Sequence, residues 1–422
     1  MSRDTEWRPD PLGGTTRRGF LKGVTILAAT SPAFARTPRQ RQSSGKVPMI
    51  AYVGTYSLPQ GPAGAATGNG QGIHLFDLDP ASGALTPREV IANPSNPAWL
   101  AFDPSRTHLY SANEIATYQG TGSGSVSAYA IDRASGHLTL LNTVSSEGAG
   151  PAHMSIHPSG KHALVANYGG GTTAVLPILP TGGRTAATDV KHNAGTPGPA
   201  RATSAPPGSF AISGHEQPHA HMILSDPSGR FVLVSDLALD QILIWKFDAE
   251  KGTLTPNDPP FVSLPRGDGP RHFVFHPNGR WMYSLQEEAS TLVTFDYDAA
   301  AGKLTAKQTV SSLPKGFSGT SFTSEVMISA DAKFLYAANR LHDSIAWFSI
   351  GPTGTLTWAG AESTRGDYPR SFNIDPTGTF LYSCNQRSDA ITTFRINRDT
   401  GKLTFTDQYT AVGAPACIIF LS

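Results

Sequence analysis

The segment Phe273–Gln286, FVFHPNGRWMYSLQ, reads as an apolar strand, a tight turn and a second apolar strand that ends in a polar residue. Copies of this unit occur at 99–113, 154–167, 223–236, 326–339 and 372–385. The turn carries proline at positions 104, 158, 227, 277 and 376 and alanine at 330, and the terminal polar residue follows nine positions later in every copy. A fixed offset in six copies indicates that the chain is built from one repeated structural unit.

A second marker has the same period. The pattern Gly-x-Leu-Thr begins at Gly83, Gly136, Gly252, Gly302, Gly354 and Gly401, mostly 47 to 53 residues apart. One interval is double, which indicates a degenerate copy near Gly182–Gly183 and a long loop over 181–217. Each unit therefore holds about four short strands joined by Gly, Pro and Asp turns, without helical periodicity.

Four strands per unit, repeated radially, are typical of β-propeller blades. Innermost strands are expected to start near Trp99, His153, Met222, His272, Glu325, Ser371 and Cys417. The first strand, Met49–Val53, has no partner before it, and the last, Cys417–Leu421, has none after it. Pairing these two strands removes both free edges. The sequence thus predicts an all-β, seven-bladed propeller whose ring is closed by the C-terminal strand on the N-terminal strands.

Composition excludes several classes of protein. The 422 residues carry a net charge of +1, which provides no electrostatic footprint for nucleic acid. Apolar residues make up 39% of the chain, which suffices for a large core. We expect the protein to be a monomer. Two cysteines cannot form a disulfide scaffold, and whether Cys384 and Cys417 pair stays open. No apolar run in the body of the chain reaches the ~18 residues of a membrane span.

The N-terminus resembles an export signal. Arg17 and Arg18 are followed by Phe-Leu-Lys, a short apolar stretch and the small-x-small site Ala33–Ala35. This order is that of a signal peptide, and the paired arginines are typical of the twin-arginine pathway. We expect a signal peptide over 1–35, a flexible tether over 36–48 and the propeller over 49–422. The protein would then interact with the twin-arginine export machinery, and it would contact the membrane only during export. We expect it in the periplasm or secreted.

Polar residues gather where innermost strands begin and second strands end, two places that must share one face of a propeller. The residues predicted to converge there are His153, His219, His221, Arg271, Glu287, Glu325, Arg340 and Arg370. Arginines beside carboxylates and imidazoles suit an acidic substrate and proton transfer. A metal at His219 and His221, with Glu287 or Asp236 as third ligand, is the competing interpretation. We expect no metal or other cofactor, because the arginines would repel a cation.

Several motifs together resemble a known family. They are Asn167–Gly171, Pro218–His221, Gly269–His272, Asn339–Ser344 and Pro369–Phe372. Over roughly residues 51–420 they are similar to the lactonase family of seven-bladed propellers, which includes 6-phosphogluconolactonases and the carboxymuconate-lactonizing enzyme. In the lactonizing enzyme a His, two Arg and a Glu are implicated. The resemblance places these roles on Arg271, Glu287 and Arg340 and on either His219 or His221. The chain departs from the family pattern at Gln286–Glu288 and at 319–324.

The resemblance implies a metal-independent lactone hydrolase that opens a sugar lactone or a related acidic lactone. The expected catalytic residues are Glu287, Arg271, His221, His219 and Arg340. Substrate-binding roles are expected for His153, Glu325, Arg370, Asn339, Asp236 and Tyr168. Either Glu287 or a histidine would activate water, while Arg271 and Arg340 would bind the acidic group and the oxyanion. The alternatives are a lactonizing cycloisomerase acting on an unsaturated diacid, and an exported binding or scaffolding propeller without catalysis.

Overall fold

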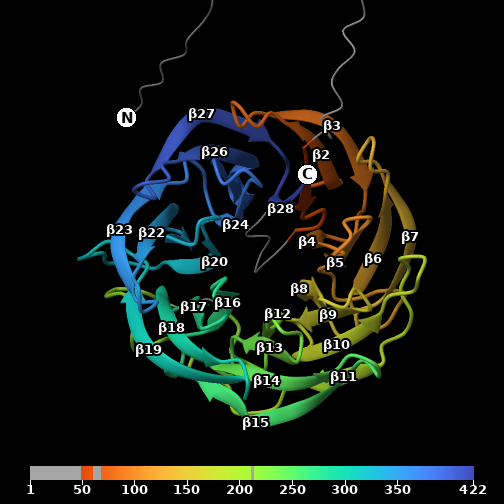
Figure 1. The fold of residues 1–422 in the computed structure, drawn as a ribbon, viewed down its shortest axis with the longest axis horizontal. Coiled ribbons are helices and arrows are strands. Elements are labelled where there is room, and N and C mark those ends of the chain that lie inside the picture. The colour runs from red at the N-terminus through yellow and green to blue at the C-terminus, as the bar shows by residue number, and fades with distance from the viewer. Residues whose placement is uncertain (1–48, 60–67, 211–212) are drawn as a thin grey trace, which may run out of the picture. The chain divides into compact units, whose positions relative to one another are not determined.

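Seven four-stranded antiparallel sheets surround one axis in the computed structural model of the chain (Figure 1). The structure describes residues 49–59, 68–210 and 213–422. The predicted seven-bladed propeller is confirmed. The expected signal peptide (1–35) and tether (36–48) lie outside the described residues. None of the helical segments in the described ranges has the length and hydrophobicity needed to cross a bilayer.

The first four blades, each given from its innermost strand outward, follow the chain in order. Blade 1 is β4 (Pro97–Phe102), β5 (His108–Asn113), β6 (Ser125–Ile131) and β7 (Leu138–Ser145). Blade 2 is β8 (Pro151–Ile156), β9 (His162–Asn167), β10 (Thr172–Pro177) and β11 (Asp189–His192). Blade 3 is β12 (Ala220–Ser225), β13 (Phe231–Asp236), β14 (Gln241–Asp248) and β15 (Thr253–Ser263). Blade 4 is β16 (Pro270–Phe275), β17 (Trp281–Gln286), β18 (Thr291–Asp298) and β19 (Lys303–Ser311).

The remaining three blades complete the ring. Blade 5 is β20 (Phe322–Ile328), β21 (Phe334–Arg340), β22 (Ser344–Ile350) and β23 (Leu356–Ser363). Blade 6 is β24 (Pro369–Ile374), β25 (Phe380–Asn385), β26 (Ala390–Ile396) and β27 (Leu403–Ala411), with a 3₁₀ turn at Gln386–Ser388. Blade 7 is β28 (Pro415–Leu421), β1 (Ile50–Thr55), β2 (Gly72–Leu78) and β3 (Leu85–Ala92).

The ring closes in blade 7, where the two ends of the propeller pair. Strand β28 is antiparallel to β1, with Leu421 opposite Ile50 and Cys417 opposite Gly54. The predicted pairing of the C-terminal strand with the N-terminal strands is therefore confirmed. Cys384 and Cys417 are both free and buried, which answers the question that the sequence left open.

The Gly-x-Leu-Thr marker has a structural cause at the blade interfaces. A buried tyrosine on the second strand of one blade donates its hydroxyl hydrogen to the carbonyl of the marker glycine in the next blade. The four such bonds are Tyr52–Gly136, Tyr283–Gly354, Tyr336–Gly401 and Tyr382–Gly83, at 2.7 to 2.9 Å. The glycine at 354 has φ +83°, and a Cβ there would lie 2.4 Å from the Trp281 ring. Glycine is thus required both by the backbone conformation and by the packing between blades.

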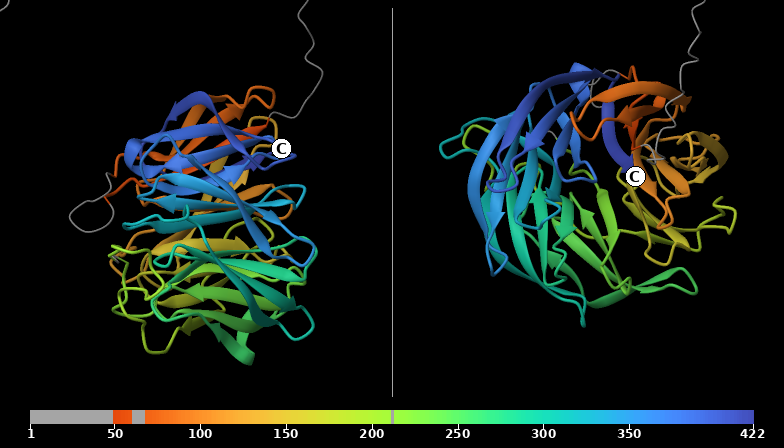
Figure 2. Two further views of the ribbon diagram at one scale, coloured as in Figure 1. Left: turned by 90° about the vertical axis from the view of Figure 1, so that its left-hand side faces the viewer. Right: turned by 45° about the horizontal axis from the view of Figure 1, so that its top comes forward.

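Blade 2 contains the degenerate copy. The predicted loop over 181–217 is partly wrong, because four of its residues form the short outer strand β11. The connection from β11 to β12 then runs over residues 193–219. In the edge-on view of Figure 2 the described parts of this connection, 193–210 and 213–219, lie on the face opposite the C-terminus. We call its face the mouth, which is the face on which innermost strands begin and second strands end.

A β-bulge interrupts the start of every innermost strand. The pairing register shifts between Pro97 and Trp99 in β4, and corresponding shifts occur in β8, β12, β16, β20, β24 and, opposite Gly54 and Thr55, in β28. The extra residue of a bulge has no partner in the ladder and changes the direction of its neighbours' side chains. The extra residues are Ala98, Ala152, His221, Arg271, Ser324 with Glu325, Arg370 and Ala416.

Candidate active site

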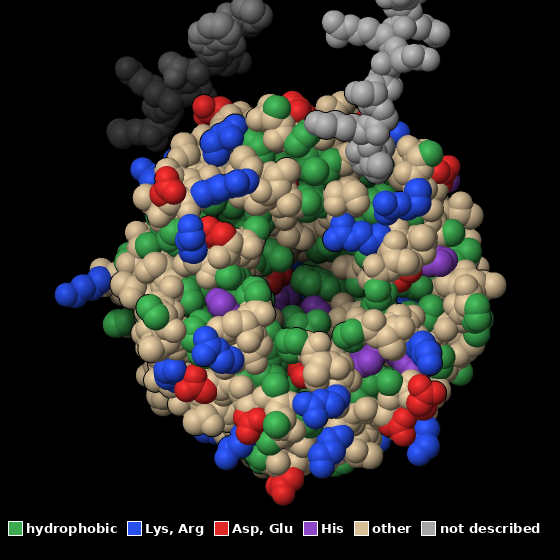
Figure 3. Space-filling model, in the orientation of Figure 1, with side chains coloured by type: hydrophobic (Ala, Val, Ile, Leu, Met, Phe, Trp, Pro, Cys, Tyr) green, Lys and Arg blue, Asp and Glu red, His purple; other side chains and the backbone are tan. Residues whose placement is uncertain are grey.

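The bulges bring residues from six blades to one narrow cavity at the mouth end of the axis. Its wall contains the bulge residues Ala98, Ala152, His221, Arg271, Arg370 and Ala416, together with Tyr56, Trp99, Glu114 and His272. At the bulge position three blades contribute alanine and three contribute a charged or imidazole side chain. Figure 3, in the orientation of Figure 1, shows the opposite face of the ring, which is also hollowed at its centre, where hydrophobic and histidine side chains lie.

Glu287 links the two arginines that the sequence assigned to catalysis. Its Oε2 lies 2.8 Å from Nε of Arg271 and 2.7 Å from Nη2 of Arg340. Its Oε1 accepts a hydrogen bond of 2.7 Å from Ser213, which belongs to the long connection between β11 and β12. Arg271 also donates to the Ser324 carbonyl, and Arg340 donates to that of Thr323 at 2.9 Å. Both carboxylate oxygens of Glu287 therefore have protein partners.

These contacts determine the charge states in the cluster. Burial favours the neutral form of Glu287, but the Arg340 and Arg271 guanidinium groups outweigh it and lower its pKa to about 2. Burial lowers the pKa of Arg271 to about 9, and the neighbouring Arg370 and Arg340 add to this effect. Glu287 is consequently a carboxylate held between cations at neutral pH, and a weak base.

Arg370 reaches the cavity from blade 6. Its Nη2 lies 3.6 Å from Oε2 of Glu114, which also accepts a 2.7 Å hydrogen bond from the Tyr56 hydroxyl. Beside it, the Tyr368 ring stacks under the Arg387 guanidinium at 3.8 Å, and the Tyr368 hydroxyl accepts a bond of 3.0 Å from Arg340. The arginines of the mouth thus outnumber the carboxylates paired with them, which makes this end of the axis suited to an anion.

The histidines of the mouth differ in their surroundings. His221 and His153 are buried, and burial together with nearby cations or imidazoles holds the pKa of each well below its usual value. His221 lines the cavity, and its Nδ1 has no hydrogen-bond partner among the described residues. His219 instead stacks on Tyr168 at 4.2 Å, and its Nδ1 lies 2.8 Å from the Tyr168 carbonyl oxygen. Of the two candidate histidines, His221 is the one that the structure places in the cavity wall.

Two residues expected to bind substrate have structural contacts. Asn339 donates to the Ser312 carbonyl and to Ser344, and it accepts from the Ser312 hydroxyl. Asp236 accepts from the backbone N–H groups of His219 and Leu239 and from the Asn193 side chain. Both side chains are fully buried and bonded to protein groups, and neither lines the mouth cavity. Their contact with substrate stays a prediction. Asn339 and Asp236 thus hold neighbouring loops, whereas Glu114, which follows the polar residue Asn113 at the end of another second strand, lines the cavity.

The other predicted substrate-binding residues are divided between the cavity and its surroundings. Arg370 is in the wall. The His153 ring packs against the ring of the wall residue Trp99, with 4.5 Å between their centroids. Tyr168 stacks on His219, outside the wall. Glu325 is 3.0 Å from Nδ1 of His272 and is not among the lining residues.

Sequence reasoning missed Tyr56, Trp99, Glu114, Ser213 and His272. Glu114 had a signal, because it directly follows the polar residue Asn113 at the end of a second strand, just as Glu287 follows Gln286. His272 was missed because a regular strand would point it away from Arg271. The bulge between Pro270 and His272 brings both side chains to the cavity.

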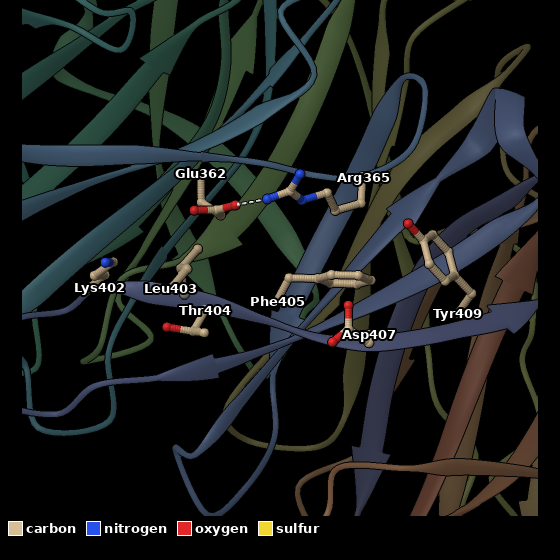
Figure 4. A pocket seen from close by; sticks show the side chains of 8 residues that line it. All are labelled: Glu362, Arg365, Lys402, Leu403, Thr404, Phe405, Asp407 and Tyr409. Carbon is tan, nitrogen blue, oxygen red and sulfur yellow. Dashed lines mark hydrogen bonds and ion pairs between the residues drawn. The ribbon is translucent and has the colours of Figure 1, made fainter.

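The described residues offer no metal-binding cluster, and a groove on the outer strands lacks the buried histidines and arginines of the mouth cavity. Among the described residues, no group of three or more His, Cys, Asp or Glu side chains is arranged to hold a metal ion. Figure 4 shows a groove on the outer strands, lined by eight residues that include Glu362, Arg365 and Tyr409. No histidine is among these eight, and its ion pair Arg365–Glu362, at 2.9 Å, is partly exposed to solvent.

Comparison with known proteins agrees with this geometry. Residues 50–420 match the family model described as lactonase, 7-bladed β-propeller. The chain belongs to this lactonase family. It is 32% identical over 374 residues to the 6-phosphogluconolactonase of Bacillus subtilis, covering 88% of this chain and 98% of that protein. It is 30% identical over 358 residues to the 6-phosphogluconolactonase of Serratia proteamaculans, covering 85% and 98%.

A solved structure provides a further comparison for this lactonase-family chain. The periplasmic gluconolactonase of Pseudomonas aeruginosa superposes with a TM-score of 0.78 at 28% identity. The superposition covers 89% of this chain and 99% of that chain. The similarity therefore extends over the whole propeller, and the resemblance drawn from the sequence motifs is confirmed at the level of the family.

The two ion pairs of Glu287, with Arg271 and with Arg340, predict that the stability of the fold depends on pH. Glu287→Gln leaves two buried guanidinium groups without their anion, so the free energy of unfolding should fall by about 3–5 kcal/mol at pH 7. A carboxyl whose pKa is 4.5 when unfolded and about 2 when folded stabilises the fold above pH 4.5 and loses this contribution as pH falls towards 2. Urea unfolding from pH 7 to pH 2.5 should show the difference between wild type and variant shrinking over that window.

The matched control is Glu362→Gln, which breaks the partly exposed pair with Arg365. It should change the free energy of unfolding by less than about 1 kcal/mol. A difference for Glu287→Gln that is no larger than this, or that does not depend on pH, contradicts the assigned charge states.

Proposed function

We propose that this chain hydrolyses a small lactone in the cavity at the mouth, with His221 as the base and Arg271 as the principal oxyanion donor. One observation carries the proposal: a neutral imidazole and a fixed guanidinium share the wall of one narrow cavity. Ester hydrolysis needs a base that takes a proton from water and a cation for the oxygen that becomes negative. Membership of the lactonase family, and the lactonase names of its relatives, support lactones as the substrate class.

Of the two bases that the sequence left open, the environment favours the histidine. The pKa of Glu287, lowered to about 2 by Arg340 and Arg271 against the effect of burial, leaves it little tendency to take a proton. His221 is neutral at pH 7 because burial and the nearby Arg271 lower its pKa. Glu287 then acts as a positioning residue that fixes Arg271 and Arg340 through its Oε2.

The arginines of the mouth support an acidic group on the substrate. Arg340, Arg370 and Arg387 lie around Tyr56 and Tyr368, and a carboxylate or phosphate suits guanidinium groups held in fixed positions. We propose that these three bind the acidic group of the lactone, while Arg271 contacts the ester. The cycloisomerase alternative would use the same residues, but the relatives that support hydrolysis are named for lactone opening.

Replacing the base tests this proposal. His221→Asn should lower kcat/KM for gluconolactone or its 6-phosphate by about 10²–10⁴-fold, because the attacking water loses its proton acceptor. His219→Asn should cost less, since His219 contacts Tyr168 and the cavity wall does not include it. The control His137→Asn changes a half-exposed histidine just before the outer strand β7 and should leave the rate unchanged. Activity of His221→Asn within tenfold of wild type excludes His221 as the base.

The same assay tests the acidic group. Rising salt should raise KM for the phosphorylated lactone and leave KM for neutral gluconolactone nearly constant, because only the anion is bound through charge. Equal salt responses for the two substrates contradict a role for the arginines in binding an acidic group.

We further propose that the protein is exported to the periplasm by the twin-arginine pathway. Support comes from Arg17 and Arg18 with the apolar stretch and small-x-small site behind them, and from the similarity to a periplasmic gluconolactonase. In a bacterium with this pathway, the double variant Arg17→Lys, Arg18→Lys should remain in the cytoplasmic fraction, while wild type is recovered from the periplasm. Periplasmic recovery of both proteins refutes this route.

A further inference from the structure

His272 and Glu325 form a buried pair beside the proposed base that the mechanism above does not use. Nδ1 of His272 lies 3.0 Å from Oε1 of Glu325, and both side chains are more than nine-tenths buried. Two bulges create the contact. The register shift between Pro270 and His272 turns His272 into the cavity wall, and the shift between Thr323 and Val326 turns Glu325 behind it.

The orientation of the His272 ring is fixed on several sides. Trp99, His153 and His221 meet it edge to face, with ring centroids at 5.2, 5.5 and 5.1 Å. The Glu325 carboxyl is itself held by the N–H of Val326 at 3.0 Å. Nε2 of His272, on the other side of the ring from this contact, has no hydrogen-bond partner among the described residues. A carboxyl that orients an imidazole whose second nitrogen is unoccupied is the arrangement of an acid–base pair.

The charge state of the pair agrees with this role. Burial raises the pKa of Glu325 to about 8, and burial together with Arg271 holds the pKa of His272 well below its usual value. At neutral pH the carboxyl therefore holds a proton, and the imidazole is neutral with its Nδ1 facing that proton. A neutral imidazole that accepts at Nδ1 carries its hydrogen on Nε2.

We propose that His272, backed by Glu325, is the general acid that protonates the ring oxygen of the lactone as the ring opens. The inference rests on the proposed hydrolysis and adds the second proton transfer that this reaction needs. The leaving group of a sugar lactone is an alkoxide, which is a poor leaving group until it is protonated.

Two proton transfers accompany the hydrolysis. Water gives a proton to His221, and its oxygen bonds to the lactone carbonyl carbon, whose oxygen becomes negative against Arg271. As the carbonyl forms again, the bond from carbon to the ring oxygen breaks. The ring oxygen takes the Nε2 proton of His272, and Nδ1 takes the proton of Glu325. The product is the hydroxy acid. His221 is left protonated, Glu325 ionised and His272 protonated on Nδ1 only. A proton that passes from His221 through solvent to Nε2 of His272, with return of the Nδ1 proton to Glu325, restores all three groups.

The test uses leaving groups of different basicity. Glu325→Gln keeps the shape of the side chain without its transferable proton, and His272→Asn keeps an amide near Glu325 but removes Nε2. Wild type and both variants are assayed on aliphatic lactones such as gluconolactone and on aryl lactones such as dihydrocoumarin, whose phenolate leaves without prior protonation. We expect kcat on the aliphatic lactones to fall at least 100-fold in both variants and kcat on the aryl lactones to fall less than tenfold.

The control is Glu89→Gln, which alters the partly exposed pair, at 2.9 Å, of Glu89 in the outer strand β3 with His137, and should change neither rate. Equal losses on the two kinds of lactone, with unfolding temperatures near that of wild type, would assign the pair a structural role and overturn the inference. Unchanged rates on aliphatic lactones would overturn it as well. A wild-type protein that opens no lactone of either kind refutes the proposed function itself, which distinguishes that failure from the failure of the acid.

Discussion

The site depends on one backbone irregularity, the β-bulge at the start of each innermost strand. A regular strand alternates its side chains between two faces, so that only every second residue could reach the axis. The bulge adds a residue that has no ladder partner and turns it towards the centre. Because the bulge recurs in all seven blades, residues more than 300 positions apart, such as Ala98 and Ala416, line the same cavity. Alanine occupies the bulge position in three blades, and His221, Arg271 and Arg370 occupy it in three others. The residue type at this position therefore determines which sides of the cavity carry reactive or charged groups.

Charge balance in a buried region explains the roles of the individual residues. Glu287 is ionised because Arg271 and Arg340 outweigh its burial, and in return it holds both guanidinium groups in place. Glu325, equally buried but without a direct cation contact, has a raised pKa and holds its proton. Two glutamates in one site thus reach opposite charge states through their neighbours, and this difference underlies the positioning role proposed for Glu287 and the acid role proposed for the His272–Glu325 pair. The imidazoles stay neutral because burial and nearby cations lower their pKa.

The repeat made the fold predictable from sequence. The constant nine-residue offset from turn to polar residue predicted six innermost strands, and the unpaired first and last strands predicted the seventh and the closure of blade 7. Convergence of Arg271, Glu287, Arg340 and His221 at the mouth was also predictable, because strand direction fixes which ends share a face.

The bulges were not predictable, since no residue type marks them in all seven blades, and so His272 was missed. The sequence could not show that Asn339 and Asp236 lie outside the cavity wall, because a polar residue at a strand end looks the same in sequence whether it faces a cavity or holds a loop. Their hydrogen-bond partners come from loops that the repeat pattern does not describe.

The central claim is that chemistry occurs where the bulge residues meet. Its most direct test is a crystal structure of the protein soaked with gluconolactone or with its hydroxy-acid product. We predict ligand density in the mouth cavity, with the ester or carboxylate oxygen in hydrogen-bond contact with Arg271 and with the rings of His221 and His272 on either side. Density confined to the outer groove near Arg365 and Tyr409, together with an empty mouth at saturating ligand, would contradict the account.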